Sequence, residues 1–352
     1  MKAIEIEKLT KNYGSSRGIT GLSMSVDAGD FYGFIGPNGA GKSTTIRTIL
    51  GYIKPTSGSA RILGIDITEG IDEIHKRTGY LPSEINFYKG MRVKEVIRYS
   101  AKLRGMNCDS EAAKLCERLD LDTGKRVEEL SLGNRKKVGI ICAVQHHPEL
   151  LILDEPTSGL DPLMQREFFG ILTEENRRGA TIFFSSHVLS EVQEHCEMAA
   201  FIRDGRIIIA DKVGNLKKTG AKKVTVSGEV TDSDIERLRK AAEAVDNVER
   251  TASGKHTSFL YHGDIKKLLG FLIDQNIRNV NITEPSLEEI FMNYYDTKQT
   301  GGINNTYDTN NVMQDAVHSI DNSEKTVHYN DDNENAVNNN DDGENTGHDD
   351  VN

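Results

Sequence analysis

The sequence contains no tryptophan and only four cysteines among its 352 residues. The cysteines, Cys108, Cys116, Cys142 and Cys196, form no C-x-x-C pair and no evenly paired framework. This pattern indicates buried or incidental thiols in a reducing compartment. Apolar runs are also short, and none approaches the roughly 18 residues that a membrane-spanning helix needs. The N-terminal stretch MKAIEIEKLTKNYG lacks the apolar core of a signal peptide, so we expect a cytosolic protein.

The body of the chain has no excess of charge of either sign. The net charge is −11, and residues 301–352 account for all of it with twelve Asp or Glu and one Lys. The rest of the chain therefore carries 42 basic and 42 acidic side chains. A neutral body gives no electrostatic footprint for nucleic acid, so we expect no nucleic-acid partner.

The acidic segment 301–352 is rich in Asn and Asp and nearly lacks apolar residues, as in NNNDDGENTGHDD. Such a segment cannot bury enough surface to offset the entropy of ordering, which predicts a disordered tail. Its composition could also suggest calcium binding. The D-x-[DN]-x-[DN]-G spacing with a closing Glu is absent, however, which favours a solvated tail.

Two folded regions are expected before this tail. In residues 1–216, short continuous apolar runs such as FYGFI and LLILD are typical of buried parallel strands, and residues 92–146 read mostly as helix. The stretch FIRDGRIIIAD has a D-G turn between apolar arms, which indicates a hairpin. Residues 221–296 read as βαββαβ and then a helix, PSLEEIFMNYY. That order predicts a small α+β, ferredoxin-like domain.

Residues 36–44 read GPNGAGKST and match the phosphate-loop pattern G-x-x-x-x-G-K-[ST] (Walker A). In this pattern the glycines let backbone N–H groups close around phosphate oxygens, Lys42 reaches the β and γ phosphates, and the Ser43 hydroxyl ligates Mg²⁺. The loop leaves a strand and opens a helix, whose positive end adds to the attraction. We therefore predict binding of a nucleoside triphosphate with Mg²⁺. The predicted nucleotide-binding residues here are Gly36, Pro37, Asn38, Gly39, Ala40, Gly41, Lys42, Ser43 and Thr44.

Two further segments carry candidate catalytic residues. The run LLILDE ends in Asp154, which can hold Mg²⁺, and Glu155, which can polarise an attacking water. An acidic strand end without chemistry is the alternative, which the upstream phosphate loop disfavours. His187 follows the next buried strand at its carboxyl end, where open α/β sheets bind ligands. A lone histidine is more often structural, but this position predicts contact with the γ-phosphate.

Five motifs now occur in one order: GPNGAGKST, LSLGN, LLILDEP, SGLD and SSH. Together they resemble the ATPase subunit of ATP-binding cassette (ABC) transporters, over residues 2 to about 216. More narrowly, LSLGNRKKVGI and PSLEEIFMNYY are similar to the separate ATPase chains of two-component bacterial exporters. The resemblance implies a P-loop NTPase cassette with a helical subdomain. It also implies ATP hydrolysis that drives a separate membrane permease, and a peripheral place on the inner face of the cell membrane.

The resemblance also implies a head-to-tail dimer with itself or a paralogue. LSLGN stands where the family has its signature loop, usually LSGGQ. Ser131 and the Gly133 N–H would touch the γ-phosphate held by the partner, in addition to the ordinary N-cap role of Ser131. Tyr13 matches the residue that stacks on adenine, although a tyrosine at a strand end is common.

Two positions depart from the family pattern. Leu132 replaces the first signature glycine, and Ser83 stands where the family usually has a Gln that helps hold Mg²⁺ and links the site to the permease. Ser83 is too short for that reach, and Glu84 or a water is a possible substitute. Phe87 and Tyr88 just beyond could pack against a permease helix or in the core.

A soluble ABC ATPase acting on ribosomes or DNA is the alternative function. Such proteins commonly carry two cassettes or a long coiled coil, whereas this chain has one cassette and no sustained heptads. A GTPase is disfavoured because no N-K-x-D tetrad occurs. The sequence leaves open the transported compound and whether the C-terminal domain assists dimerisation, senses a regulator, or does neither.

Overall fold

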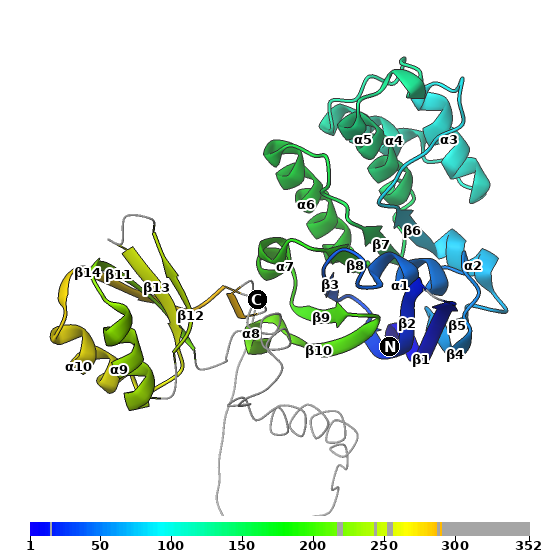
Figure 1. Ribbon diagram of the computed structural model, residues 1–352. Helices are drawn as coiled ribbons and strands as arrows, with labels where there is room; N and C mark the ends of the chain where they lie inside the picture. Colours follow the sequence, from blue (N-terminus) through cyan, green and yellow to red (C-terminus); the bar gives the residue numbers. More distant parts are fainter. Residues whose placement is uncertain (15, 217–220, 243–244, 252–255, 287–288, 291–352) are drawn as a thin grey trace, which may run out of the picture. The chain divides into compact units, whose positions relative to one another are not determined.

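The computed structural model describes residues 1–14, 16–216, 221–242, 245–251, 256–286 and 289–290 (Figure 1). The predicted acidic tail and most of the helix predicted at 285–295 lie outside these residues. Among the residues described, no helix is both long and apolar enough to cross a lipid bilayer.

A six-stranded sheet forms the centre of the first region, in the order β10-β9-β3-β8-β7-β6. All neighbours are parallel except the hairpin of β9 and β10. In that hairpin the predicted D-G turn is confirmed, because Asp204 and Gly205 both have positive φ, as a tight hairpin turn requires. The strands are β3 (Phe31–Ile35), β6 (Thr78–Leu81), β7 (Leu150–Asp154), β8 (Thr181–Ser186), β9 (Met198–Arg203) and β10 (Arg206–Lys212).

A smaller antiparallel sheet, in the order β2-β1-β4-β5, packs on one face of this central sheet. Side chains of β7 alternate between two cores, one on each face of the central sheet. Ile152 lies in the core shared with the smaller sheet, whereas Leu151 and Leu153 lie in the core on the helical side. The apolar runs are thus continuous because both faces are covered. The strands of the smaller sheet are β1 (Lys2–Tyr13), β2 (Ser16–Asp27), β4 (Ser57–Ile62) and β5 (Ile65–Asp66).

Helices of the first region lie between these strands, except α8, which follows β10. Ile46 of α1 lies in the core with the smaller sheet, and Phe168 of α6 and Val192 of α7 lie in the core on the other side. The sheet is therefore a middle layer between two covering layers. The helices are α1 (Lys42–Ile49), α2 (Ile71–Arg77), α6 (Pro162–Arg177), α7 (Leu189–His195) and α8 (Val213–Leu216).

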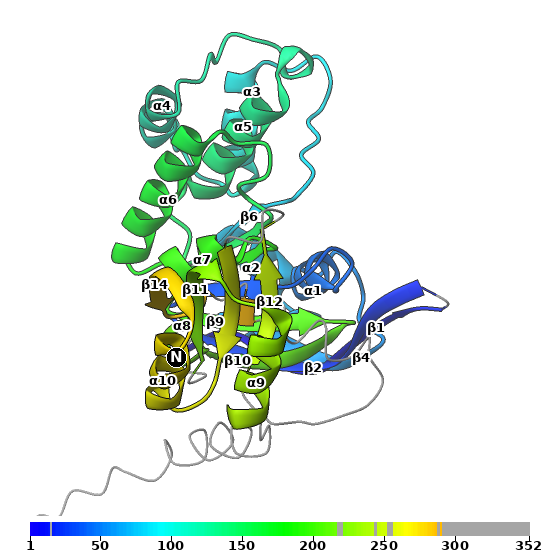
Figure 2. The same cartoon turned by 60° about the vertical axis from the view of Figure 1, so that its left-hand side comes forward.

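A helical part is inserted between β6 and β7 and lies at one end of this region in both views (Figures 1 and 2). Ser131 caps α5 by accepting a hydrogen bond from the Asn134 N–H at 3.3 Å. Phe87, before the first helix, packs partly buried against the core, whereas Tyr88 is exposed. The elements are α3 (Val93–Leu103), α4 (Asp109–Arg118), the short 3₁₀ helix η1 (Val127–Glu129) and α5 (Leu132–Val144).

The described residues after 221 form a separate antiparallel sheet, in the order β12-β13-β11-β14. Its own core unites Leu238 of α9 and Leu268 of α10 with Phe259 of the sheet, so both helices cover the same face. The elements are β11 (Lys222–Glu229), α9 (Asp232–Ala242), β12 (Val245–Arg250), β13 (His256–Tyr261), α10 (Ile265–Ile273) and β14 (Asn276–Thr283).

Candidate functional site

The phosphate loop connects β3 to α1 at the carboxyl end of the central sheet. Gly41, the N-cap of α1, has φ 110°, which only glycine adopts readily, and no side chain caps the helix. Gly36 must also be glycine, since a Cβ there would lie 2.4 Å from the carbonyl oxygen of Ile202. The first-turn N–H groups of α1 thus have no capping side chain, an arrangement suited to an anion.

Lys42, the first residue of α1, is buried beside this loop. Its ammonium donates to the carbonyl oxygens of Gly36 at 2.6 Å and Pro37 at 3.2 Å. It also forms an ion pair with Glu155, with 3.0 Å between Nζ and Oε1. Carbonyl oxygens of the phosphate loop therefore fix the Lys42 ammonium, which also contacts the Glu155 carboxylate at the end of β7.

Glu155 follows β7 and contacts the segments that follow β3 and β8. Its second carboxylate oxygen lies 2.5 Å from Nδ1 of His187, which follows β8. Its backbone N–H donates to the carbonyl and hydroxyl oxygens of Ser185, both at 3.2 Å. Glu155 also has φ 49°, an unusual conformation for a non-glycine residue that often marks a functional position. The structure thus brings together Lys42, Glu155 and His187, three of the predicted site residues.

Asp154, the last residue of β7, is fully buried. Its Oδ1 accepts a hydrogen bond from the Ser185 hydroxyl at 2.7 Å. Its Oδ2 has no hydrogen-bond partner among the described residues. A buried carboxylate oxygen without a donor is costly unless a ligand satisfies it. Asp154 therefore fits a ligand of a Mg²⁺ ion, held directly or through water.

Lys136 also belongs to this site, although it is not among the residues predicted from the sequence. It lies on α5 and is 2% exposed, and its Nζ donates to the carbonyl oxygens of Glu155 at 2.9 Å and Ser83 at 3.4 Å. Burial lowers the pKa of Lys136 to about 8, and Asp154 and Glu155 oppose that shift. A signal was present, because Lys136 precedes Ile140 by four residues and so shares a helix face with the core.

Three other predicted residues, Tyr13, Ser131 and Gly133, lie on other elements. Tyr13 ends β1, is 43% exposed, and has the Lys11 ammonium 5.2 Å from its ring centre. Ser131 and Gly133 lie at the start of α5, in the helical part (Figures 1 and 2). Leu132 between them is 65% exposed.

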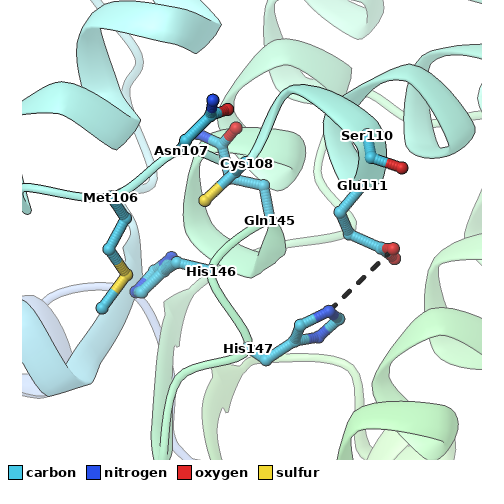
Figure 3. Close-up of a pocket in the computed structure, with 8 residues that line it drawn as sticks. All are labelled: Met106, Asn107, Cys108, Ser110, Glu111, Gln145, His146 and His147. Atoms are coloured by element: carbon cyan, nitrogen blue, oxygen red, sulfur yellow. Dashed lines mark ion pairs between the residues drawn. The ribbon is translucent and has the colours of Figure 1, made fainter.

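A cavity of about 430 Å³ opens in the helical part and contains none of the predicted site residues (Figure 3). His146 beside it is 9% exposed, and burial, together with the nearby Arg104 charge, lowers its pKa to about 4. His147 and Glu111 face each other across the cavity at 4.0 Å. The lining residues are Met106, Asn107, Cys108, Ser110, Glu111, Gln145, His146 and His147.

Similarity to known proteins extends over most of the chain. The family model described as "ABC transporter" matches residues 19–158. The chain is 34% identical to the uncharacterized ABC transporter ATP-binding protein YhaQ of Bacillus subtilis, over 82% of this chain and 97% of YhaQ. It is also 34% identical to the bacitracin transport ATP-binding protein BcrA of Bacillus licheniformis, over 82% of this chain and 96% of BcrA.

Solved structures show the same cassette fold. An ATP-binding subunit of an ABC transporter superposes with a TM-score of 0.58 at 28% identity, over 61% of this chain and 92% of the other. The cassette MJ0796, described as dimeric, gives a TM-score of 0.55 at 23% identity, over 60% of this chain and 98% of the other. The predicted P-loop cassette is thereby confirmed.

The phosphate loop, the buried Asp154 at the end of β7 and the LSLGN segment at the start of α5 thus occur within one chain. This chain aligns with nearly the full length of two transporter ATP-binding proteins. This chain belongs to the ABC transporter ATP-binding protein family and is an ATP-hydrolysing subunit of such a transporter.

Proposed function

We propose that ATP is bound and cleaved where Lys42, Glu155 and His187 meet. The contact of Glu155 with both other side chains is the observation that carries this assignment. Lys42 would bind the β and γ phosphates, and the uncapped start of α1 would receive phosphate oxygens through its N–H groups. Glu155 would accept the proton of the attacking water, with His187 holding its second oxygen and reaching the γ-phosphate.

Ser43 and Asp154 would hold the Mg²⁺ that accompanies ATP. When bound, the ion would neutralise charge that develops on the phosphate oxygens. The unpartnered Oδ2 of Asp154 supports this role, and the Ser185 hydroxyl would keep the carboxylate in place through its other oxygen. Phosphate oxygens would compete with Glu155 for the Lys42 ammonium. ATP binding would therefore break this ion pair and leave the Glu155 carboxylate free to accept a proton from the attacking water.

A complete site would need two subunits, the second being another copy of this chain or a paralogue. Ser131 is the N-cap of α5, and the Gly133 N–H lies in the first turn of this helix, where α5 presents its positive end. They would meet the γ-phosphate bound to the partner's phosphate loop. Tyr13 is proposed to stack on adenine, which its exposed place at the end of β1 supports.

The ATPase pair would drive a separate polytopic permease, at the inner face of the cell membrane, and the direction would be export. The naming of BcrA as a bacitracin transport protein supports a transporter role for this chain. The permease, rather than this subunit, would select the compound that is transported. A soluble role on ribosomes or DNA is not favoured by these relatives.

An affinity pull-down tests this proposal directly. Tagged Glu155→Gln chain would be recovered with ATP and Mg²⁺ from gently solubilised membranes of its own cell, with tagged Lys42→Ala as the matched control. We expect one polytopic membrane protein to be recovered with Glu155→Gln, in an ATP-dependent manner that Lys42→Ala lacks. Recovery of ribosomes, DNA or only the chain itself would overturn the permease assignment.

A further inference from the structure

Lys136 is a buried lysine at the junction of three segments of the cassette. It lies one turn into α5, and its Nζ donates to carbonyl oxygens after two different strands. Ser83 follows β6, and Glu155 follows β7, and these two strands are parallel neighbours paired up to Leu81 and Leu153. The ammonium therefore bridges the carboxyl ends of two adjacent strands from a helix outside the sheet.

A packing role alone would not need an ammonium here. Burying a charge costs free energy that an apolar side chain of similar length would avoid. The surrounding face of α5, with Ile140 and Ala143 also buried, would accept such a side chain. The lysine is instead directed at the backbone of Glu155, and burial leaves its pKa at about 8.

The bond to Glu155 acts on a residue with an unusual conformation. The left-handed φ of 49° is held from one side by the two bonds of the Glu155 N–H to Ser185, and from the other by Lys136 at the carbonyl oxygen. That conformation directs the carboxylate to Lys42 and His187. Loss of either restraint would let the peptide relax and turn the carboxylate away.

We propose that Lys136 is a positioning residue for ATP hydrolysis, which fixes the Glu155 peptide and ties it to the Ser83 loop and to α5. This inference rests on the proposed role of Glu155 as the base. Lys136 would act through Glu155 and touch no reacting atom. Ser83 would then help to hold Lys136 through its backbone carbonyl oxygen. The short side chain of Ser83 does not matter for this role.

The test uses the full-length chain and the variant Lys136→Met, which removes the donors while keeping a side chain of similar length. We expect kcat for ATP hydrolysis to fall about tenfold or more, whereas the Kd for ATP should not rise. Lys114→Met, on the exposed face of α4, is the matched control and should leave both values unchanged. Lys136→Gln, which keeps an amide NH2 group as a donor, should lose less activity than Lys136→Met.

A double variant separates positioning from a general loss of structure. In a Glu155→Gln background, Lys136→Met should change the residual turnover by less than about twofold, because the carboxylate that it positions is gone. An unchanged kcat for Lys136→Met alone, or an equal loss in both backgrounds, would overturn the inference. Should Lys136→Met fail to fold, the same two comparisons are made with Lys136→Leu, which also lacks a donor. Wild-type turnover by Glu155→Gln would instead overturn the proposed base, a distinct result.

Discussion

Lys42 of the phosphate loop and Glu155 at the end of β7 form an ion pair, with 3.0 Å between Nζ and Oε1. The carboxylate thus neutralises the lysine that is proposed to bind phosphate, and phosphate oxygens must compete with it for that lysine. The same contact keeps Glu155 beside the position where the γ-phosphate would lie. Loss of the Glu155 charge should therefore strengthen ATP binding but slow ATP hydrolysis.

Glu155→Gln should bind ATP several-fold more tightly and hydrolyse it at least about 100-fold more slowly. Binding strengthens because a negative charge beside the phosphates is removed, and turnover falls because an amide cannot accept the proton. Equilibrium binding of labelled ATP and phosphate release measure the two effects. Glu69→Gln, an exposed substitution of the same kind, should change neither value. Weaker ATP binding by Glu155→Gln would contradict the competition described above.

Lys42→Ala should lose about 2–3 kcal/mol of ATP binding, roughly 30- to 150-fold, because it removes a charged donor to phosphate.

Ser131→Asp should abolish hydrolysis by placing a negative charge where the partner's γ-phosphate would lie. Since Asp is as good an N-cap as Ser, α5 should remain folded.

Mixing the two variants tests whether the sites are shared between subunits. A Lys42→Ala chain paired with a Ser131→Asp chain contains one site with both parts intact, so part of the ATPase activity should return. A single chain carrying both substitutions, mixed with wild type, provides the control, because every site in that heterodimer is damaged. Absence of recovery in the first mixture, with dimers formed, would contradict the head-to-tail arrangement.

Tyr13→Ala should weaken ATP binding by about 1–3 kcal/mol, roughly 5- to 150-fold, since it removes the proposed stacking surface for adenine. Tyr13→Phe keeps the ring and should bind as wild type does. Affinity measured for ATP and for inorganic triphosphate distinguishes the base from the phosphates. An equal loss for both ligands would show that Tyr13 does not stack on adenine.

His146 makes the stability of the cassette sensitive to acid. Its pKa is lowered to about 4 in the folded chain, so between pH 6.5 and 4 the unfolded chain binds a proton that the folded chain does not. Stability contributed by neutral His146 is therefore present above pH 6.5 and lost as pH falls to about 4. The loss amounts to about 3 kcal/mol.

Urea unfolding at a series of pH values measures this effect. The free energy of unfolding of wild type should fall more steeply below pH 6.5 than that of His146→Leu, with no further difference below about pH 4. His256→Gln, at an exposed position, should follow the wild-type curve. Parallel curves for wild type and His146→Leu would contradict the lowered pKa.

Several parts of this fold could be predicted because they depend on residues adjacent in the chain. The phosphate loop needs glycines at 36 and 41, a strand before them and a helix after them, and all of these are local. The D-G turn at Asp204 and Gly205 is likewise set by two residues that tolerate positive φ. Continuous apolar runs such as 150–153 predicted strands buried on both faces, because a half-exposed strand would alternate.

The tertiary structure decided which distant groups meet. Three segments distant in the chain carry the site: Lys42 follows β3, Asp154 and Glu155 lie at the end of β7, and His187 follows β8. They reach one edge of the sheet only because β3, β8 and β7 are parallel neighbours. Lys136 belongs to a basic run that resembles an ordinary solvated helix start, and only the packing of α5 against the sheet shows it buried on Glu155. Sequence alone determined the chemistry of each segment, since that depends on local residue types. The partners of each charge were decided by packing, since contacts between residues distant in the chain exist only once the sheet has formed.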